Sequence, residues 1–76
     1  MVITLEQINK KLAEAIKHSG LSQSEIARRV GINQAQIYRY LNKQKLPSLD
    51  SFANLCLVLD VDPADIFCIS EYKKEN

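Results

Sequence analysis

Side chains that can pair with the edges of nucleic-acid bases are concentrated between Asn33 and Asn42. The amides of Gln34 and Gln36 can pair bidentately with adenine N6 and N7, and the guanidinium of Arg39 can do the same with guanine O6 and N7. A helix that carries such groups on its outer face fits the major groove of double-stranded DNA. The segment is therefore a candidate for base recognition.

Apolar spacing in this segment predicts a helix over about residues 33–41, on which Ile37, Tyr40 and Leu41 face inward. The outward positions hold Ala35, Gln36, Tyr38, Arg39 and Asn42. Ala35 can contact a thymine methyl group. Tyr38 suits either the groove or a plain surface position. We predict base contacts by Gln34, Ala35, Gln36, Tyr38 and Arg39.

Groups that suit the DNA backbone flank the predicted helix. Free N–H groups at helix starts near Gln23 and Gln34 suit a phosphate, and Lys43 and Lys45 add positive charge. We assign phosphate contacts to Gln23, Asn33, Asn42, Lys43, Lys45 and Ser48. Such contacts add affinity and salt dependence but no choice of sequence.

The distribution of charge favours a nucleic-acid partner more than the total charge does. The 76 residues carry a formal net charge of +1. Residues 21–50 carry a net charge of +3, whereas residues 51–76 carry a net charge of −3. Phosphate binding needs a local basic face, and the middle of the chain has one. Arg28 and Arg29 fit either contact with the backbone or a solvated face.

The residue types argue against catalysis and metal binding. Two cysteines, Cys56 and Cys68, and the single histidine His18 are too few for a closed zinc site or a disulfide framework. The chain offers no Ser/His/Asp set, no paired carboxylates in an apolar setting and no glycine-rich phosphate loop. We therefore expect no enzyme activity, no cofactor and no metal. Cys56 lies in an apolar helical pattern and is expected in the core.

Spacings of three and four between apolar residues predict an all-α fold with five helices. The first is expected over residues 4–19. The expected N-caps are Thr4, Ser22, Asn33, Ser48 and Asp62. Ser22 and Glu25 fit a reciprocal capping box, in which each side chain accepts the backbone N–H of the other. Gly31 and Asp60 mark the ends of the second and fourth helices.

The first and fourth helices have the most extensive apolar faces. The first is expected to bury Leu5, Ile8, Leu12, Ala15 and Ile16. The fourth is expected to bury Leu49, Phe52, Ala53, Leu55, Cys56 and Leu59. Ile66 and Phe67 close the core. We expect one domain over residues 1–69 and a polar, frayed tail over residues 70–76.

The second and third helices, joined by a short turn at Gly31, form a helix-turn-helix unit. Ala27 is small because the third helix crosses close to it. Gly31 can take a left-handed conformation without strain, and Ile37 fills the space between the two helices. The other helices bury the inner face of this unit.

The stretch from about Leu12 to Phe67 resembles the lambda repressor/Cro-like (Xre-type) helix-turn-helix family. The resemblance is carried by Gln23, Ala27, Gly31, Ile37 and Tyr40, by Pro47-Ser48, and by Leu59 and Val61. It implies a compact five-helix fold and operator binding, usually as a dimer on a palindromic site. It also implies that Gln23 contacts phosphate. The positions that it implies for the major groove are Asn33, Gln34, Ala35, Gln36, Tyr38 and Arg39. Ile16 stands where many relatives have a basic residue, and Lys43 where a glycine is common.

The fourth helix is more apolar than one buried face requires. Leu57, Val58 and Val61 form a predicted dimer interface, because so small a domain reads too few base pairs by itself. The main alternative is an antitoxin-like or anti-repressor-like module, whose decisive surface binds a protein. The absence of a signal-peptide pattern and of a long apolar run predicts a cytoplasmic regulator, most simply a repressor.

Overall fold

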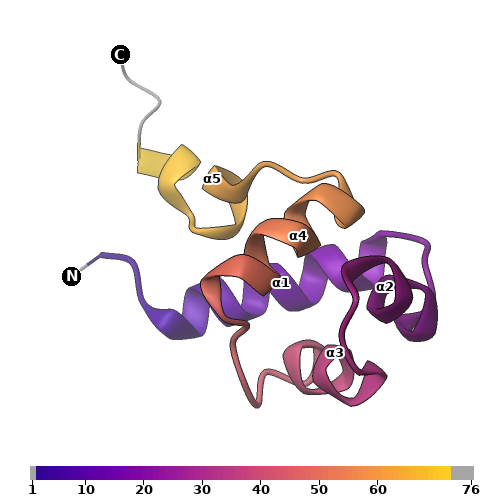
Figure 1. The fold of residues 1–76 in the computed structure, drawn as a ribbon. Helices are drawn as coiled ribbons and strands as arrows, with labels where there is room; N and C mark the ends of the chain where they lie inside the picture. The colour runs from indigo at the N-terminus through magenta and orange to yellow at the C-terminus, as the bar shows by residue number, and fades with distance from the viewer. Residues whose placement is uncertain (1, 73–76) are drawn as a thin grey trace.

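Figure 1 shows the computed structural model, which describes residues 2–72. Within that range the chain forms five α-helices and a final 3-10 helix, with no strand. They are α1 (Leu5–His18), α2 (Gln23–Val30), α3 (Gln34–Leu41), α4 (Leu49–Leu59), α5 (Pro63–Ile66) and η1 (Ile69–Tyr72). The predicted all-α fold with five α-helices is confirmed.

The first helix, α1, runs through the middle of the molecule (Figure 1). It contacts α3 and α5, while α2 contacts both α3 and α4. The α2–α3 pair is therefore supported from two sides, by α1 and by α4. This arrangement holds α3 at the edge of the molecule with one face free.

The core is apolar, and no charged or polar residue among the described residues is buried. Its fully buried side chains come from four different helices and are Leu12, Ile26, Ile37 and Leu55. Ile16, at the position where many relatives have a basic residue, belongs to the same core. The rings of Phe52 and Phe67, with centroids 4.7 Å apart, connect α4 to the end of α5.

Three residues predicted to be buried are exposed. Leu5 is 66% exposed and Leu49 is 83% exposed, and Ala53 also lies at the surface. Leu49 and Ala53 share with Leu57 a spacing of four residues, which places all three on the side of α4 that faces away from the core. Leu5 lies in the first turn of α1, at the edge of the packed helices. Two residues not predicted, Ala13 and Cys68, are buried instead.

Most helix starts have the predicted caps. The N–H of Gln7 donates to Thr4 Oγ1 at 3.2 Å and that of Thr4 to Gln7 Oε1 at 2.8 Å, a full capping box that the sequence analysis did not identify. Asp62 Oδ1 accepts the N–H of Ala64 at 3.0 Å, and Pro63 is the first residue of α5. Gly31 ends α2 with φ of 86°, and Asp60 ends α4 with φ of 57°.

Two predicted caps differ from the structure. Ser22 Oγ accepts the N–H of Glu25 at 3.1 Å, but the Glu25 carboxylate binds Arg28 and Arg29 rather than the backbone N–H of Ser22. A carboxylate interacts more strongly with charged guanidinium groups than with a neutral N–H. Ser48 occupies the N-cap position of α4, but its hydroxyl donates to Asp50 Oδ1 at 2.6 Å instead of capping the helix.

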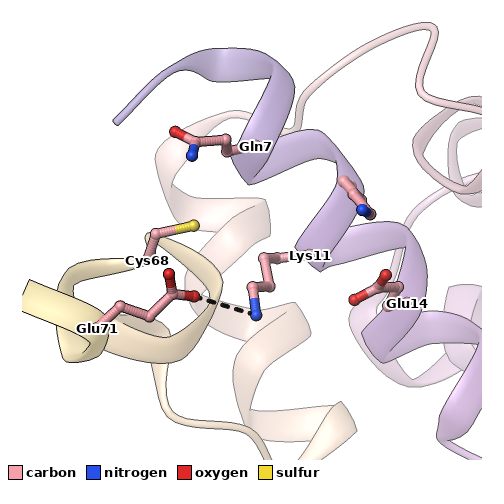
Figure 2. A pocket seen from close by; sticks show the side chains of 6 residues that line it. Gln7, Lys11, Glu14, Cys68 and Glu71 are labelled. Carbon is pink, nitrogen blue, oxygen red and sulfur yellow. Dashed lines mark ion pairs between the residues drawn. The ribbon is translucent and has the colours of Figure 1, made fainter. Parts of the chain in front are cut away.

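A 3-10 helix, η1, spans Ile69–Tyr72 at the start of the segment that was predicted to be a polar tail. Lys11 Nζ lies 3.2 Å from Glu71 Oε2, and this ion pair connects α1 to η1 (Figure 2). The pair lies in a pocket that Cys68 also lines, and the hydrogen bond to Glu71 raises the pKa of Lys11. The rest of the predicted tail, residues 73–76, lies outside the described residues. Within residues 2–72, no helix combines the length and the apolar composition of a membrane span.

Candidate nucleic-acid interface

The turn between α2 and α3 is built around Gly31. With φ of 86°, Gly31 has the left-handed conformation that glycine adopts without strain. The N–H groups of Gly31 and Ile32 both donate to the carbonyl of Ala27, at 2.8 and 3.0 Å. Asn33 then begins the next helix, and its Oδ1 accepts the N–H of Ala35 at 2.8 Å. The turn is therefore determined by hydrogen bonds within the helix-turn-helix unit.

The helices α2 and α3 pack against each other, and each contributes buried apolar residues. Ala27 is 4% exposed and Ile37 is completely buried, and the two helices are in contact. Tyr40, one turn after Ile37, is 3% exposed. Because these inward residues are anchored in the core, the orientation of α3 about its own axis is determined by packing.

Four of the five residues predicted to contact bases are exposed on α3, and the fifth is half-buried. Gln34, Ala35, Tyr38 and Arg39 are the exposed residues, and Gln36 is the half-buried one. Tyr38 is 53% exposed, so its ring is available to a partner. The free face of α3 therefore presents amide, guanidinium, phenol and methyl groups together.

A pocket beside α3 brings together residues from three segments of the chain. It is lined by Ile32, Asn33, Gln36, Tyr40, Lys45, Ser48 and Ser51. Four of these had been predicted for DNA contacts, one of them (Gln36) with a base. Lys45 Nζ donates to Gln36 Oε1 at 3.1 Å across the pocket. Ser51 was not predicted, because its position in the first turn of α4 gives no sign that it lies beside α3.

The remaining predicted phosphate contacts lie around α3. Asn42 and Lys43 are exposed just after the helix, and Gln23 is half-buried at the first position of α2. Asn42 Nδ2 donates to the carbonyl of Tyr38 at 2.9 Å, which leaves one amide N–H of Asn42 for an outside acceptor. Lys43 has φ of 60°, in the left-handed region that glycine adopts without strain.

Arg28 and Arg29 form ion pairs within α2. Both are exposed, and the Glu25 carboxylate accepts hydrogen bonds from both, with Arg29 Nε at 2.6 Å from Glu25 Oε2. Hydrogen bonds from Arg28 and then Arg29 lower the pKa of Glu25 to about 2. These arginines therefore offer a partner less free positive charge than their number suggests.

A comparison with family models found a helix-turn-helix family that matches residues 12–66. Comparisons with curated proteins and with solved structures found no match. The family match covers the five α-helices except for the first turns of α1, and it includes the whole α2–α3 unit described above. The chain belongs to the lambda repressor/Cro-like (Xre-type) helix-turn-helix family, whose members are DNA-binding regulatory domains.

Proposed function

We propose that this protein is a sequence-specific DNA-binding transcriptional regulator of the cytoplasm, acting as a repressor, with α3 in the major groove. One observation carries the proposal. The free face of α3 holds side chains that pair with base edges, while Ile37 and Tyr40 anchor its opposite face in the core. Membership of a DNA-binding family supports the same conclusion.

The proposed contacts divide into two groups. Base edges are read by Gln34, Ala35, Gln36, Tyr38 and Arg39. The backbone on either side is held by Gln23, Asn33, Asn42, Lys43, Lys45 and Ser48. The first group determines which sequence is bound, and the second contributes affinity that falls as salt rises.

A homodimer on a palindromic operator completes the proposal. Leu57 is 79% exposed on α4, a large apolar area for a side chain without a partner in the monomer. Val58 and Val61 are half-buried against the core and contribute less accessible surface. A two-fold dimer presents two copies of α3 to half-sites about one helical turn apart, which supplies the specificity that one copy lacks.

The proposal is tested by selecting bound sequences from a pool of random DNA duplexes. We expect enrichment of a palindromic consensus. A pool that shows no enrichment over the starting mixture contradicts sequence-specific binding. A consensus without two-fold symmetry contradicts the proposed dimer arrangement but not the reading of bases by α3.

Arg39→Ala tests the role of α3 directly. Loss of a bidentate arginine–guanine pair costs about 1–3 kcal/mol, which is roughly a 5-fold to 150-fold loss of affinity. The change is measured by fluorescence anisotropy on the selected duplex, with the fold checked by circular dichroism. Arg28→Ala is the matched control, since Arg28 is exposed but pairs with Glu25 on α2. A loss for Arg39→Ala no larger than that for Arg28→Ala would contradict base reading by Arg39.

A second candidate function is capture of a protein, as in antitoxin-like or anti-repressor-like modules. The exposure of Leu57 and the net charge of −3 over residues 51–76 favour it. In that case Leu57→Glu abolishes complex formation, whereas Arg39→Ala has no effect on it.

A further inference from the structure

The hydrogen bond between Lys45 and Gln36 connects a loop cation to a residue on the free face of α3. Lys45 Nζ donates to Gln36 Oε1 at 3.1 Å, although the two residues are nine positions apart in the chain. Both side chains line the pocket between α3 and the start of α4. Gln36 is half-buried, whereas Lys45 is exposed.

This contact determines which way the Gln36 amide faces. An ammonium group only donates hydrogen bonds, so it must meet the amide oxygen rather than the amide nitrogen. The Nε2 group of Gln36, with its two N–H donors, is then directed away from Lys45. The Lys45 ammonium keeps two further N–H groups beside it. Together the two side chains form a surface rich in donors.

Such a surface matches guanine better than adenine. A glutamine pairs bidentately with adenine by accepting from N6 and donating to N7. That geometry uses the same oxygen that accepts from Lys45. The oxygen can accept two hydrogen bonds, but the adenine N6 amino group would then lie close to the ammonium, donor beside donor. Guanine presents two acceptors, N7 and O6, in the major groove, and both can accept from the N–H groups of this pair.

The other glutamine on this face of α3 is a natural comparison. Among the hydrogen bonds within residues 2–72, none involves the side chain of Gln34, which is exposed. Its amide is free to turn either way and keeps the geometry that suits adenine. The same side-chain type therefore meets two different environments on one helix.

We infer that Lys45 is a positioning residue that directs Gln36 toward guanine rather than adenine. The inference rests on the proposed function, because it requires α3 to lie in the major groove. It also changes the part assigned to Lys45 from a contact with the backbone to a determinant of base choice. Lys45→Met removes the N–H groups and keeps a side chain of similar length. Its effect on base preference therefore distinguishes a positioning role from a phosphate contact.

The experiment selects duplexes with the wild-type protein, Lys45→Met, Lys45→Arg and Gln36→Ala. The position read by Gln36 is the one at which Gln36→Ala loses its base preference. We expect guanine there for the wild type and for Lys45→Arg, and adenine for Lys45→Met. In anisotropy measurements on two duplexes that differ only at this base pair, the wild type should prefer guanine about tenfold. Lys45→Met should lose or reverse that preference.

Lys43→Met is the matched control, because it removes a positive charge from the same loop and, within residues 2–72, the Lys43 side chain has no hydrogen bond to α3. It should weaken binding to both duplexes by the same factor and reduce the salt dependence. If Lys45→Met does likewise, Lys45 holds only phosphate and the inference is wrong. Adenine at the Gln36 position of the wild-type consensus also overturns it. Failure of the wild type to enrich any sequence overturns the proposed function itself and is recognised by the absence of a consensus.

Discussion

At the scale of single residues, Lys43 shows that a residue other than glycine can hold the left-handed conformation that ends a helix. The N–H of Lys43 donates to the carbonyl of Tyr40 at 3.1 Å, and that of Gln44 to the carbonyl of Arg39 at 2.9 Å. This pair of bonds is a Schellman motif, which requires a left-handed residue after the helix. Lys43 supplies it with φ of 60°, at a cost that glycine avoids.

Lys43→Gly should therefore stabilise the fold. Relief of the left-handed strain is worth about 1 kcal/mol in the free energy of unfolding, measured by urea denaturation. Lys43→Ala serves as the control, because it removes the same charge but keeps the Cβ atom and the strain. Equal stability of the two variants would show that the left-handed backbone costs Lys43 nothing.

The outward face of α3 was predictable from the sequence, whereas the pairing of its side chains was not. Ile37, Tyr40 and Leu41 determine the orientation of the helix, and their spacing is visible in the sequence. The bond from Lys45 to Gln36 depends on the path of the loop after α3, and that path depends on Lys43. Lysine by its residue type gives no sign of a positive φ, and the glycine that is common at this position in the family left the path of the loop undecided.

At the scale of elements, helix starts were more predictable than the partners of the capping side chains. Thr4, Ser22, Asn33 and Asp62 cap their helices as their residue types predict. Ser48 lies at the right position, but Asp50 two residues later attracts its hydroxyl. The competing acceptor is close in sequence, yet only the local geometry decides which bond forms.

The two serine N-caps therefore predict unequal effects of mutation. Ser22→Ala removes a hydrogen bond to the N–H of Glu25 and should cost about 1 kcal/mol of unfolding free energy. Ser48→Ala removes no capping bond and should cost less than about 0.5 kcal/mol. Both values come from thermal or urea unfolding of the purified variants. A larger loss for Ser48→Ala than for Ser22→Ala would contradict the assignment of these caps.

At the scale of the whole molecule, the all-α architecture followed from the sequence but the orientation of α4 did not. Apolar residues occur on nearly every side of α4, so the spacing of these residues is compatible with more than one buried face. Contact with α2 selects Phe52, Leu55, Cys56 and Leu59 for the interior. Leu49 and Leu57 are left on the outside, and only tertiary packing distinguishes the two sets.

Leu57→Glu should separate dimer formation from folding. Because Leu57 is 79% exposed, the variant should keep the helical circular dichroism spectrum. Sedimentation should show a monomer for the variant, whereas we expect a dimer for the wild type. The affinity for the operator should fall when the dimer is lost. Leu5→Glu is the control, since Leu5 is also exposed but lies in the first turn of α1. A wild-type protein that sediments as a monomer at high concentration would remove the proposed interface.

The two cysteines give this chain a built-in reporter of its own motions. Cys56 is 5% exposed and Cys68 is 2% exposed, and burial raises the pKa of the Cys56 thiol. Alkylating reagents attack the thiolate, so each cysteine reacts only when the structure around it opens. Cys56 lies within α4, and Cys68 at the bend before η1. The labelling rate of Cys56 would report how often the core around α4 opens, and that of Cys68 how often η1 separates from the rest of the fold. No engineered probe is needed for either measurement.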